Sequence, residues 1–323
     1  MKKTIFALGQ TILQPMLQNP TDLPSVKDIF YKPFFQLLCS STVAFALLFT
    51  PGIVYAQCPA TTFTVGSGVG IPNLSGAPAG LANMTGGTVK IWGSFTVDVG
   101  SWQLRGVTVY LRTIDGSISV NNNCILDARP NPNGNVRTQF ETCPDIPRWS
   151  GIQVSSGGTA YMIDCNIFRA CKAIDLQPGS KAQITGNSFT SNYTCIGVEG
   201  AVTLFGEGIA HNSFSALPSV SGCTGTNPHA IVLNNVPNIV IGDMAQSGSS
   251  NNIVNYFTGI HATNSNLTVY NTRISFFPSI TSAAIRLIGE GGVFQANING
   301  FGNGATSPLL INDCGRGIKS MTT

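Results

Sequence analysis

The chain has 323 residues, a formal net charge of +3 and only 10% charged residues, and 36 of its residues are glycine. Glu and Lys, which favour helices, are scarce, whereas Gly, Asn, Ser and Thr are frequent, so the composition favours a β-rich, turn-rich protein. A chain this close to neutral has no basic face that would drive binding to nucleic acid, so we exclude a nucleic-acid partner.

The first predicted element is an export signal. Residues 34–56 read FFQLLCSSTVAFALLFTPGIVYA and contain a long apolar, uncharged core. Pro51-Gly52 breaks any helix there, and Val54-Tyr55-Ala56 has the small-residue spacing of a signal-peptidase site. We therefore predict that residues 1–56 are a secretory signal peptide with a long leader and that the mature protein is secreted or held at the cell surface. An uncleaved membrane anchor is the alternative interpretation; after signal removal we expect no stable membrane insertion.

Cysteine use fits an exported chain. Eight cysteines follow the predicted cleavage site: Cys58, Cys124, Cys143, Cys165, Cys171, Cys195, Cys223 and Cys314. An even number permits disulfides in an oxidising compartment, and the alternative is that several are small buried core residues. The spacings do not resemble those of a zinc site.

A short apolar unit repeats in the middle of the chain. Gly151-Ile152-Gln153-Val154, Ala173-Ile174-Asp175-Leu176 and Cys195-Ile196-Gly197-Val198 place their isoleucines 22 residues apart. A second patch recurs at Ile184–Phe189 and Ile209–Phe214, and turn residues separate the patches. Each period therefore holds at least two short strands and several corners, which is typical of a solenoid. Because one unit cannot bury its own apolar side, we predict that the coils stack as an all-β, single-stranded, right-handed parallel β-helix.

The repeat also sets the predicted boundaries. Alternating segments begin with TVKIWGSFTVDV, and later first-strand units recur at Ala230, Gly259, Ala284 and Gly317. We predict an N-terminal cap or linker over residues 57–85 and the β-helix over residues 86–323, incomplete at its C-terminal end. Asn187 and Asn212 occupy equivalent positions, and we predict that their amides form a hydrogen-bonded ladder between coils.

The pattern Gly/Ala-Ile-x-Val/Leu followed by Ile-x-x-Asn-x-Phe, behind a signal peptide, resembles the right-handed parallel β-helix (pectin lyase-like) superfamily. In particular it is similar to exported β-helix repeat proteins of Bacteroidota-type bacteria, which implies export through a bacterial inner membrane. The resemblance covers the chain from about Gly86 onward and is specific for fold but poor for activity. Such proteins often carry a C-terminal secretion-sorting domain, and one interpretation of this chain is a fragment that lacks it.

A candidate binding row follows from strand alternation. The first strand of each coil should place one residue of its repeat unit on the outer face, and in successive coils these residues are Gln153, Asp175, Gly197, Val232, His261, Arg286 and Lys319. Three long segments precede first-strand units and should leave from one corner of the coil: Arg129–Arg148, Leu217–His229 and Pro278–Ala283. We predict that Gln153, Asp175, His261 and Arg286 form an outer binding row for an extended glycan. Ordinary solvated strand residues are the alternative interpretation.

Trp149 lies beside the first of these segments. It is a candidate sugar-stacking residue, and the alternative is that it covers the edge of the core.

The sequence offers little for catalysis. Glycoside hydrolysis needs two carboxylates about 5–10 Å apart, but Asp175 has only Gln153 and Gly197 beside it on its row, and Asp164 aligns two coils on with His211. The three histidines support neither a metal triad nor a Ser-His-Asp site. We therefore predict no catalytic residue, no metal and no cofactor, with Ca²⁺ expected only if the protein is a lyase.

Two functions remain open. The first is a non-catalytic, monomeric surface or matrix protein that binds an extracellular polysaccharide or cell-surface glycan, or has an adhesive or structural role. The alternative is a polysaccharide lyase or glycoside hydrolase acting on uronic-acid-containing glycans, which the resemblance implies through the fold alone.

Overall fold

The computed structural model describes residues 58–216, 223–224, 227–243, 250–275, 282–289, 296–299, 310–312 and 316–322. The predicted signal peptide and Cys314 lie outside these residues. The chain divides into two units, and the second, Ala56–Thr323, holds every strand that the structure describes. In that described part, no helix has the length and apolar character needed to cross a membrane.

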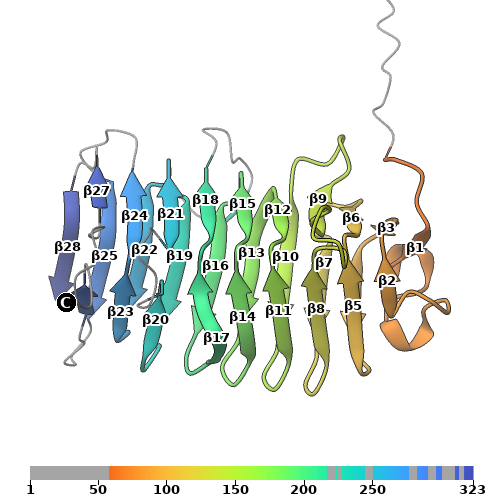
Figure 1. The fold of residues 1–323 in the computed structure, drawn as a ribbon, viewed down its shortest axis with the longest axis horizontal. Coiled ribbons are helices and arrows are strands. Elements are labelled where there is room, and N and C mark those ends of the chain that lie inside the picture. The colour runs from red at the N-terminus through yellow and green to blue at the C-terminus, as the bar shows by residue number, and fades with distance from the viewer. Residues whose placement is uncertain are drawn as a thin grey trace, which may run out of the picture. The chain divides into compact units, whose positions relative to one another are not determined.

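Three parallel sheets run along the second unit, and successive strands of the chain visit them in turn (Figure 1). Sheet 1 contains nine strands: β4 (Ser94–Val97), β7 (Ser117–Val120), β10 (Trp149–Val154), β13 (Ala170–Leu176), β16 (Thr194–Glu199), β19 (His229–Asn234), β22 (Thr258–Thr263), β25 (Ala283–Gly289) and β28 (Arg316–Thr322). Sheet 2 contains nine strands: β2 (Asn83–Thr85), β5 (Ser101–Arg105), β8 (Ile125–Arg129), β11 (Thr159–Ile163), β14 (Lys181–Thr185), β17 (Thr203–Ala210), β20 (Ile239–Ile241), β23 (Leu267–Tyr270) and β26 (Ala296–Asn299). Sheet 3 contains ten strands: β1 (Phe63–Val65), β3 (Thr88–Ile91), β6 (Thr108–Leu111), β9 (Gln139–Thr142), β12 (Asn166–Phe168), β15 (Ser188–Thr190), β18 (Ser213–Ser215), β21 (Asn251–Val254), β24 (Thr272–Ser275) and β27 (Leu310–Asn312).

The strand register confirms the parallel β-helix. Ile152 pairs with Ile174, and Ile174 pairs with Ile196, so residues one repeat apart lie directly side by side. All three isoleucines are fully buried, as expected if stacking the coils buries what one coil cannot. Sheet 3 adds an aromatic column in which the rings of Phe189 and Phe214 stack with centroids 5.0 Å apart. The core is therefore a set of inward columns that run from coil to coil.

The predicted asparagine ladder is confirmed and is longer than expected. The backbone N–H of Asn187 donates to Asn212 Oδ1 at 3.0 Å, and the backbone N–H of Asn212 donates to Asn251 Oδ1 at 3.0 Å. One coil earlier, the N–H of Cys165 donates to Asn187 Oδ1 at 2.8 Å. The buried amides thus satisfy backbone donors at the turn between sheets 2 and 3, where no strand partner can do so.

The sheets begin earlier than predicted. Strands β1 and β2 lie within the predicted cap or linker, residues 57–85, and pair in parallel with β3 and β5. The same segment carries two short 3₁₀ turns, η2 (Ser67–Val69) and η3 (Leu74–Gly76), and buries Leu74 and Leu81. It therefore forms the first coil as well as the end of the solenoid.

Contrary to the prediction, the first long segment does not leave from one corner: it covers the turn from sheet 2 to sheet 3, strand β9 and the turn from sheet 3 to sheet 1. Arg129–Arg148 contains β9, whose Phe140 and Thr142 alternate inward and are buried. Only residues 143–148 connect sheet 3 to sheet 1. Leu217–His229 and Pro278–Ala283 also join sheet 3 to sheet 1, although most of each lies outside the described residues.

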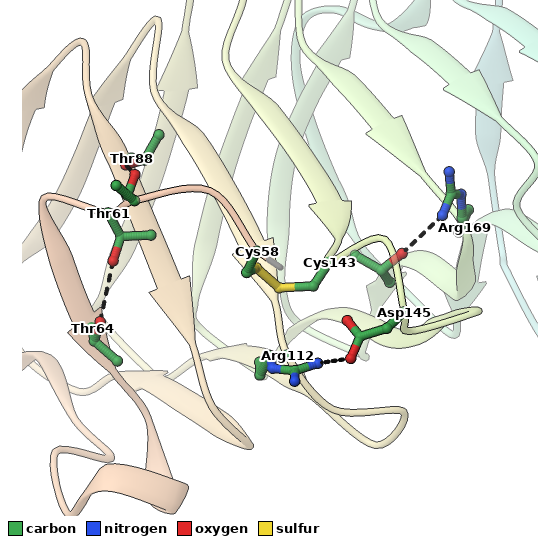
Figure 2. Close-up of a disulfide and its surroundings, with 10 residues drawn as sticks. Cys58, Thr61, Thr64, Thr88, Arg112, Cys143, Asp145 and Arg169 are labelled. Carbon is green, nitrogen blue, oxygen red and sulfur yellow. Dashed lines mark hydrogen bonds and ion pairs between the residues drawn. A yellow bond between two sulfur atoms is a disulfide. The ribbon is translucent and has the colours of Figure 1, made fainter. Parts of the chain in front are cut away.

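The cysteines fulfil both interpretations offered for them. Cys58 is bonded to Cys143, which ties the start of the described chain to the turn after β9, close to the Arg112–Asp145 ion pair (Figure 2). Cys171 on β13 is bonded to Cys223, in the segment before β19. Three others are buried and free: Cys124, Cys165 and Cys195. Two disulfides in the described chain fit an oxidising compartment.

Candidate functional site

The predicted outer row exists as a register on sheet 1. Gln153 pairs with Asp175, and His261 pairs with Arg286, each one coil apart. Gly197 and Val232 occupy the two coils between Asp175 and His261. At about 4.8 Å per coil, Asp175 and His261 are therefore about 14 Å apart. The structure brings the four predicted residues together as two pairs and not as one continuous group.

Asp175 is already engaged within the sheet. Lys172 Nζ lies 3.1 Å from Asp175 Oδ1, and Gln177 Nε2 donates to Asp175 Oδ2 at 3.0 Å. The Asp175 side chain is only 18% exposed. These contacts fit a local ion pair and amide bond better than a carboxylate held ready for a ligand.

His261 and Arg286 belong to a small basic cluster with His229. The rings of His229 and His261 meet edge to face with centroids 5.0 Å apart. Burial, followed by the charges of His261 and Arg286, lowers the pKa of His229 to about 4, and burial and Arg286 also lower the pKa of His261. Both imidazoles are therefore neutral at pH 7, and the one fixed charge in the cluster is the Arg286 guanidinium.

Trp149 is in the core and offers no ring face to a sugar, so the stacking prediction is not supported. Its side chain is 0% exposed, and its indole N–H donates to the Phe168 carbonyl at 2.8 Å. The cause is a bulge between Gly151 and Ile152, which shifts the alternation so that Trp149, three residues before Ile152, also points inward.

A second bulge, on sheet 2, brings together a candidate site that the sequence repeat does not predict. β17 pairs regularly with β14 at Lys181–Thr203 and again at Ile184–Ile209. Those pairs are 22 and 25 residues apart, so β17 holds three extra residues within its length. The segment Phe205-Gly206-Glu207-Gly208 forms the bulge, and its two glycines adopt positive φ of 54° and 68°, which side-chain-bearing residues seldom accept.

The bulge contributes to an aromatic strip on the outer face of sheet 2. The ring of Phe205 stacks on that of Tyr161 with centroids 6.0 Å apart and planes 21° apart. On β8 the guanidinium of Arg129 lies 5.5 Å from the centre of the Tyr161 ring, and Arg129 Nε also bonds Asp127 at 2.7 Å. Arg129, Tyr161 and Phe205 therefore form a half-exposed strip that follows the axis of the solenoid. We call it the aromatic strip.

A cleft of about 420 Å³ opens beside the bulge. It is lined by residues of β17, β20 and the turns next to them: Val202, Leu204, Gly206, Glu207, Gly208, Asn238, Ile239, Val240, Gly242 and Asp243. The walls combine apolar side chains with two carboxylates and an amide, as small-molecule sites do. We call it the bulge cleft.

Two carboxylates and an imidazole converge at the edge of the bulge cleft. His211 Nε2 lies 3.4 Å from Glu207 Oε2 and 3.5 Å from Asp243 Oδ2. All three ligand atoms lie within 4.8 Å of one another. Aligning the repeats at a constant spacing does not place these three residues at equivalent positions. Glu207 lies in the bulge, and Asp243 follows a coil of different length. The signal that could have revealed them is the Gly-Glu-Gly interruption together with the 25-residue step.

Comparison of the chain with models of known protein families, with curated proteins and with solved structures finds no match.

Proposed function

We propose that the protein is an exported, non-catalytic β-helix protein that binds an extracellular polysaccharide or cell-surface glycan, with the aromatic strip and the bulge cleft as its binding surface. The observation that carries the proposal is the β17 bulge. It interrupts an otherwise regular ladder, and bulges in sheets often re-aim side chains next to functional sites.

The chemistry of this surface suits a sugar chain. The stacked rings of Tyr161 and Phe205 supply half-buried aromatic surface beside the bulge cleft, and aromatic side chains of this kind can pack against the C–H face of a pyranose ring. Glu207, Asn238 and Asp243 supply hydrogen-bonding groups at the bulge cleft, and Arg129 supplies a cation at the other end of the strip. An extended polymer that runs along the solenoid axis would meet both features.

One further observation and one sequence prediction support export. The two disulfides fit an extracellular location, and the predicted signal peptide precedes the solenoid. The resemblance to pectin lyase-like proteins of Bacteroidota-type bacteria is compatible with a bacterial surface protein, although fold alone is weak support for a function.

The test is affinity electrophoresis of the purified protein in gels that contain a panel of neutral and uronate polysaccharides. We expect retardation by at least one polysaccharide, and a roughly tenfold or greater loss of affinity in Tyr161→Ala and Phe205→Ala, as is usual when a central aromatic contact is removed. Trp92→Ala is the matched control, because Trp92 is 44% exposed and carries Arg112 over its ring at 5.7 Å, away from the bulge cleft.

Retardation by no polysaccharide, or equal loss in all three variants, would overturn the proposal. Arg286→Ala tests the row on sheet 1 in the same gels. A loss of glycan affinity confined to Arg286→Ala would show that the binding surface is instead the sheet 1 row of Gln153, Asp175, His261 and Arg286.

A polysaccharide lyase or hydrolase is the second candidate, and one observation favours it. The facing oxygens of Glu207 and Asp243 lie no more than 4.8 Å apart, so the two carboxylates are near enough to act as a pair, as the carboxylates of retaining glycosidases do at about 5–5.5 Å. Incubation with the same polysaccharides, with and without Ca²⁺, tests it. Reducing ends or unsaturated products that disappear in Glu207→Gln and Asp243→Asn would establish catalysis and displace the non-catalytic proposal.

A further inference from the structure

We propose that Glu207, His211 and Asp243 bind a divalent transition-metal ion of the Zn²⁺ type, with its open coordination positions facing the bulge cleft. The inference goes beyond glycan binding, and it is tested without a glycan. The sequence predicts no metal, because its three histidines do not support a metal triad. A constant repeat also does not align Glu207, His211 and Asp243.

The distances from His211 to the two carboxylates match a metal site better than an ion pair. Zn²⁺ binds imidazole nitrogen and carboxylate oxygen at about 2.0–2.2 Å in a tetrahedron, so neighbouring ligand atoms lie about 3.3–3.6 Å apart. The two distances from His211 Nε2, 3.4 Å to Glu207 and 3.5 Å to Asp243, have this length, and the two carboxylate oxygens lie within 4.8 Å of each other. Charge-assisted hydrogen bonds between the same groups would measure about 2.7–2.9 Å.

The ligands come from three places that the fold holds together. Glu207 lies on the bulge, His211 in the turn that follows β17, and Asp243 in the turn that follows β20. The backbone N–H groups of His211 and Asp243 both donate to the buried hydroxyl of Ser250, at 3.4 and 2.8 Å. Asn271 Nδ2 also donates to the Asp243 carbonyl at 2.7 Å. The backbone around two of the ligands is therefore fixed before any ion binds.

The types of ligand decide the class of ion. Ca²⁺ and Mg²⁺ prefer sets made entirely of oxygen, whereas an imidazole with carboxylates suits Zn²⁺, Mn²⁺, Co²⁺ and related ions. Two carboxylates and a neutral imidazole would balance the charge of one divalent ion.

The site is open on one side. The side chains of Glu207, His211 and Asp243 are 44%, 28% and 15% exposed, and Glu207 and Asp243 line the bulge cleft. Closed structural zinc sites use four protein ligands, whereas three ligands and an open position are typical of zinc sites that bind a further molecule. We therefore place the remaining coordination positions on the cleft side.

The experiment is calorimetric titration of the purified protein with Zn²⁺, together with the visible spectrum of the Co²⁺ complex. We expect one ion per chain and an affinity for Zn²⁺ at least 100-fold weaker in His211→Asn and Asp243→Asn. Removing even a group that only hydrogen-bonds a metal ligand weakens metal affinity about 10–100-fold, and these variants remove a ligand itself. Asparagine is chosen at position 211 because His211 has a positive φ of 58°, which asparagine also accepts. Far-UV circular dichroism verifies that each variant keeps the β-helix.

His261→Asn is the matched control, because it removes a histidine from the other histidine-containing cluster. Binding that is retained in His261→Asn and lost in His211→Asn supports the proposal. No heat and no Co²⁺ spectrum at millimolar ion would overturn it and leave the three residues as an ion-pair cluster. Binding that survives His211→Asn, or that is lost in His261→Asn, would also overturn it.

Discussion

The asparagine ladder provides the most direct test of what holds the coils together. Asn212 is 2% exposed, and its Oδ1 accepts from the backbone N–H and from Nδ2 of Asn187, both at 3.0 Å. Its Nδ2 donates to the Ile184 carbonyl at 2.8 Å. In Asn212→Ala the backbone N–H of Asn187 and the carbonyl of Ile184 lose their hydrogen bonds to this amide. Leaving one buried group unpaired costs about 1–3 kcal/mol, so the free energy of unfolding should fall by about 2–6 kcal/mol.

Urea unfolding followed by far-UV circular dichroism measures this loss, and Asn252→Ala is the matched control. Asn252 lies on β21 next to the ladder residue Asn251, but its own buried Oδ1 has no hydrogen-bond partner within the described residues. We expect its removal to cost less than about 1 kcal/mol, since no hydrogen bond to that oxygen is lost. Equal urea midpoints for the two variants would refute the view that the ladder stabilises the stack.

Two further predictions concern pH and the disulfides. Because burial, together with the charges of His261 and Arg286, lowers the pKa of His229 to about 4, the unfolded chain binds more protons than the folded one below about pH 6.5. The free energy of unfolding should therefore fall by about 3 kcal/mol as the pH drops from about 6.5 to below 4, and a His229→Gln variant with the same slope would contradict this. Replacing Cys171 and Cys223 together by serine should lower the free energy of unfolding by up to about 4 kcal/mol, because the bond closes a segment 52 residues long. An unchanged urea midpoint would show that this bond contributes nothing.

The sequence predicts the regular part of the solenoid because the repeat and the core depend on the same residues. The same 22-residue spacing that separates Ile152, Ile174 and Ile196 in sequence also sets which residues pair between coils, because the three side chains are buried in one column. Asn187 and Asn212 were predictable for the same reason, since a ladder repeats with the coils. Any feature that recurs once per coil can be read in this way.

Features that occur once cannot be read from the repeat. The bulge at Gly151 turns Trp149 inward although simple alternation leaves it outside, and the bulge in β17 aims Glu207 toward His211. The partner of Cys171 is likewise set by a chain segment that has no counterpart in the neighbouring coils. The candidate site escaped prediction because it is built from departures from the period, whereas the fold was predicted because it is built from the period itself.

Removal of the β17 bulge should leave the core columns on either side of it in place. Deletion of residues 206–208 would leave Thr203-Leu204-Phe205-Ile209-Ala210 opposite Lys181-Ala182-Gln183-Ile184-Thr185, which restores the 22-residue step. Leu204 and Ile209 would keep their present neighbours, and Phe205 would face Gln183 in a regular pair. We therefore expect the free energy of unfolding to stay within about 1 kcal/mol of the wild-type value or to rise, because no core contact is lost and ladder bonds are gained.

The same deletion should abolish Zn²⁺ binding and weaken glycan binding, because it removes Glu207 and one wall of the bulge cleft. Glu207→Gln is the matched control for loss of the carboxylate alone, since it neutralises Glu207 but keeps the bulge. If the deletion variant unfolds or loses several kcal/mol, the bulge serves the fold, and the reasoning that assigns it to a site fails. If it stays folded and keeps both binding activities, the bulge is neither structural nor functional. The proposal that the bulge builds a binding site therefore requires a deletion variant that stays folded but no longer binds Zn²⁺ and binds glycan more weakly.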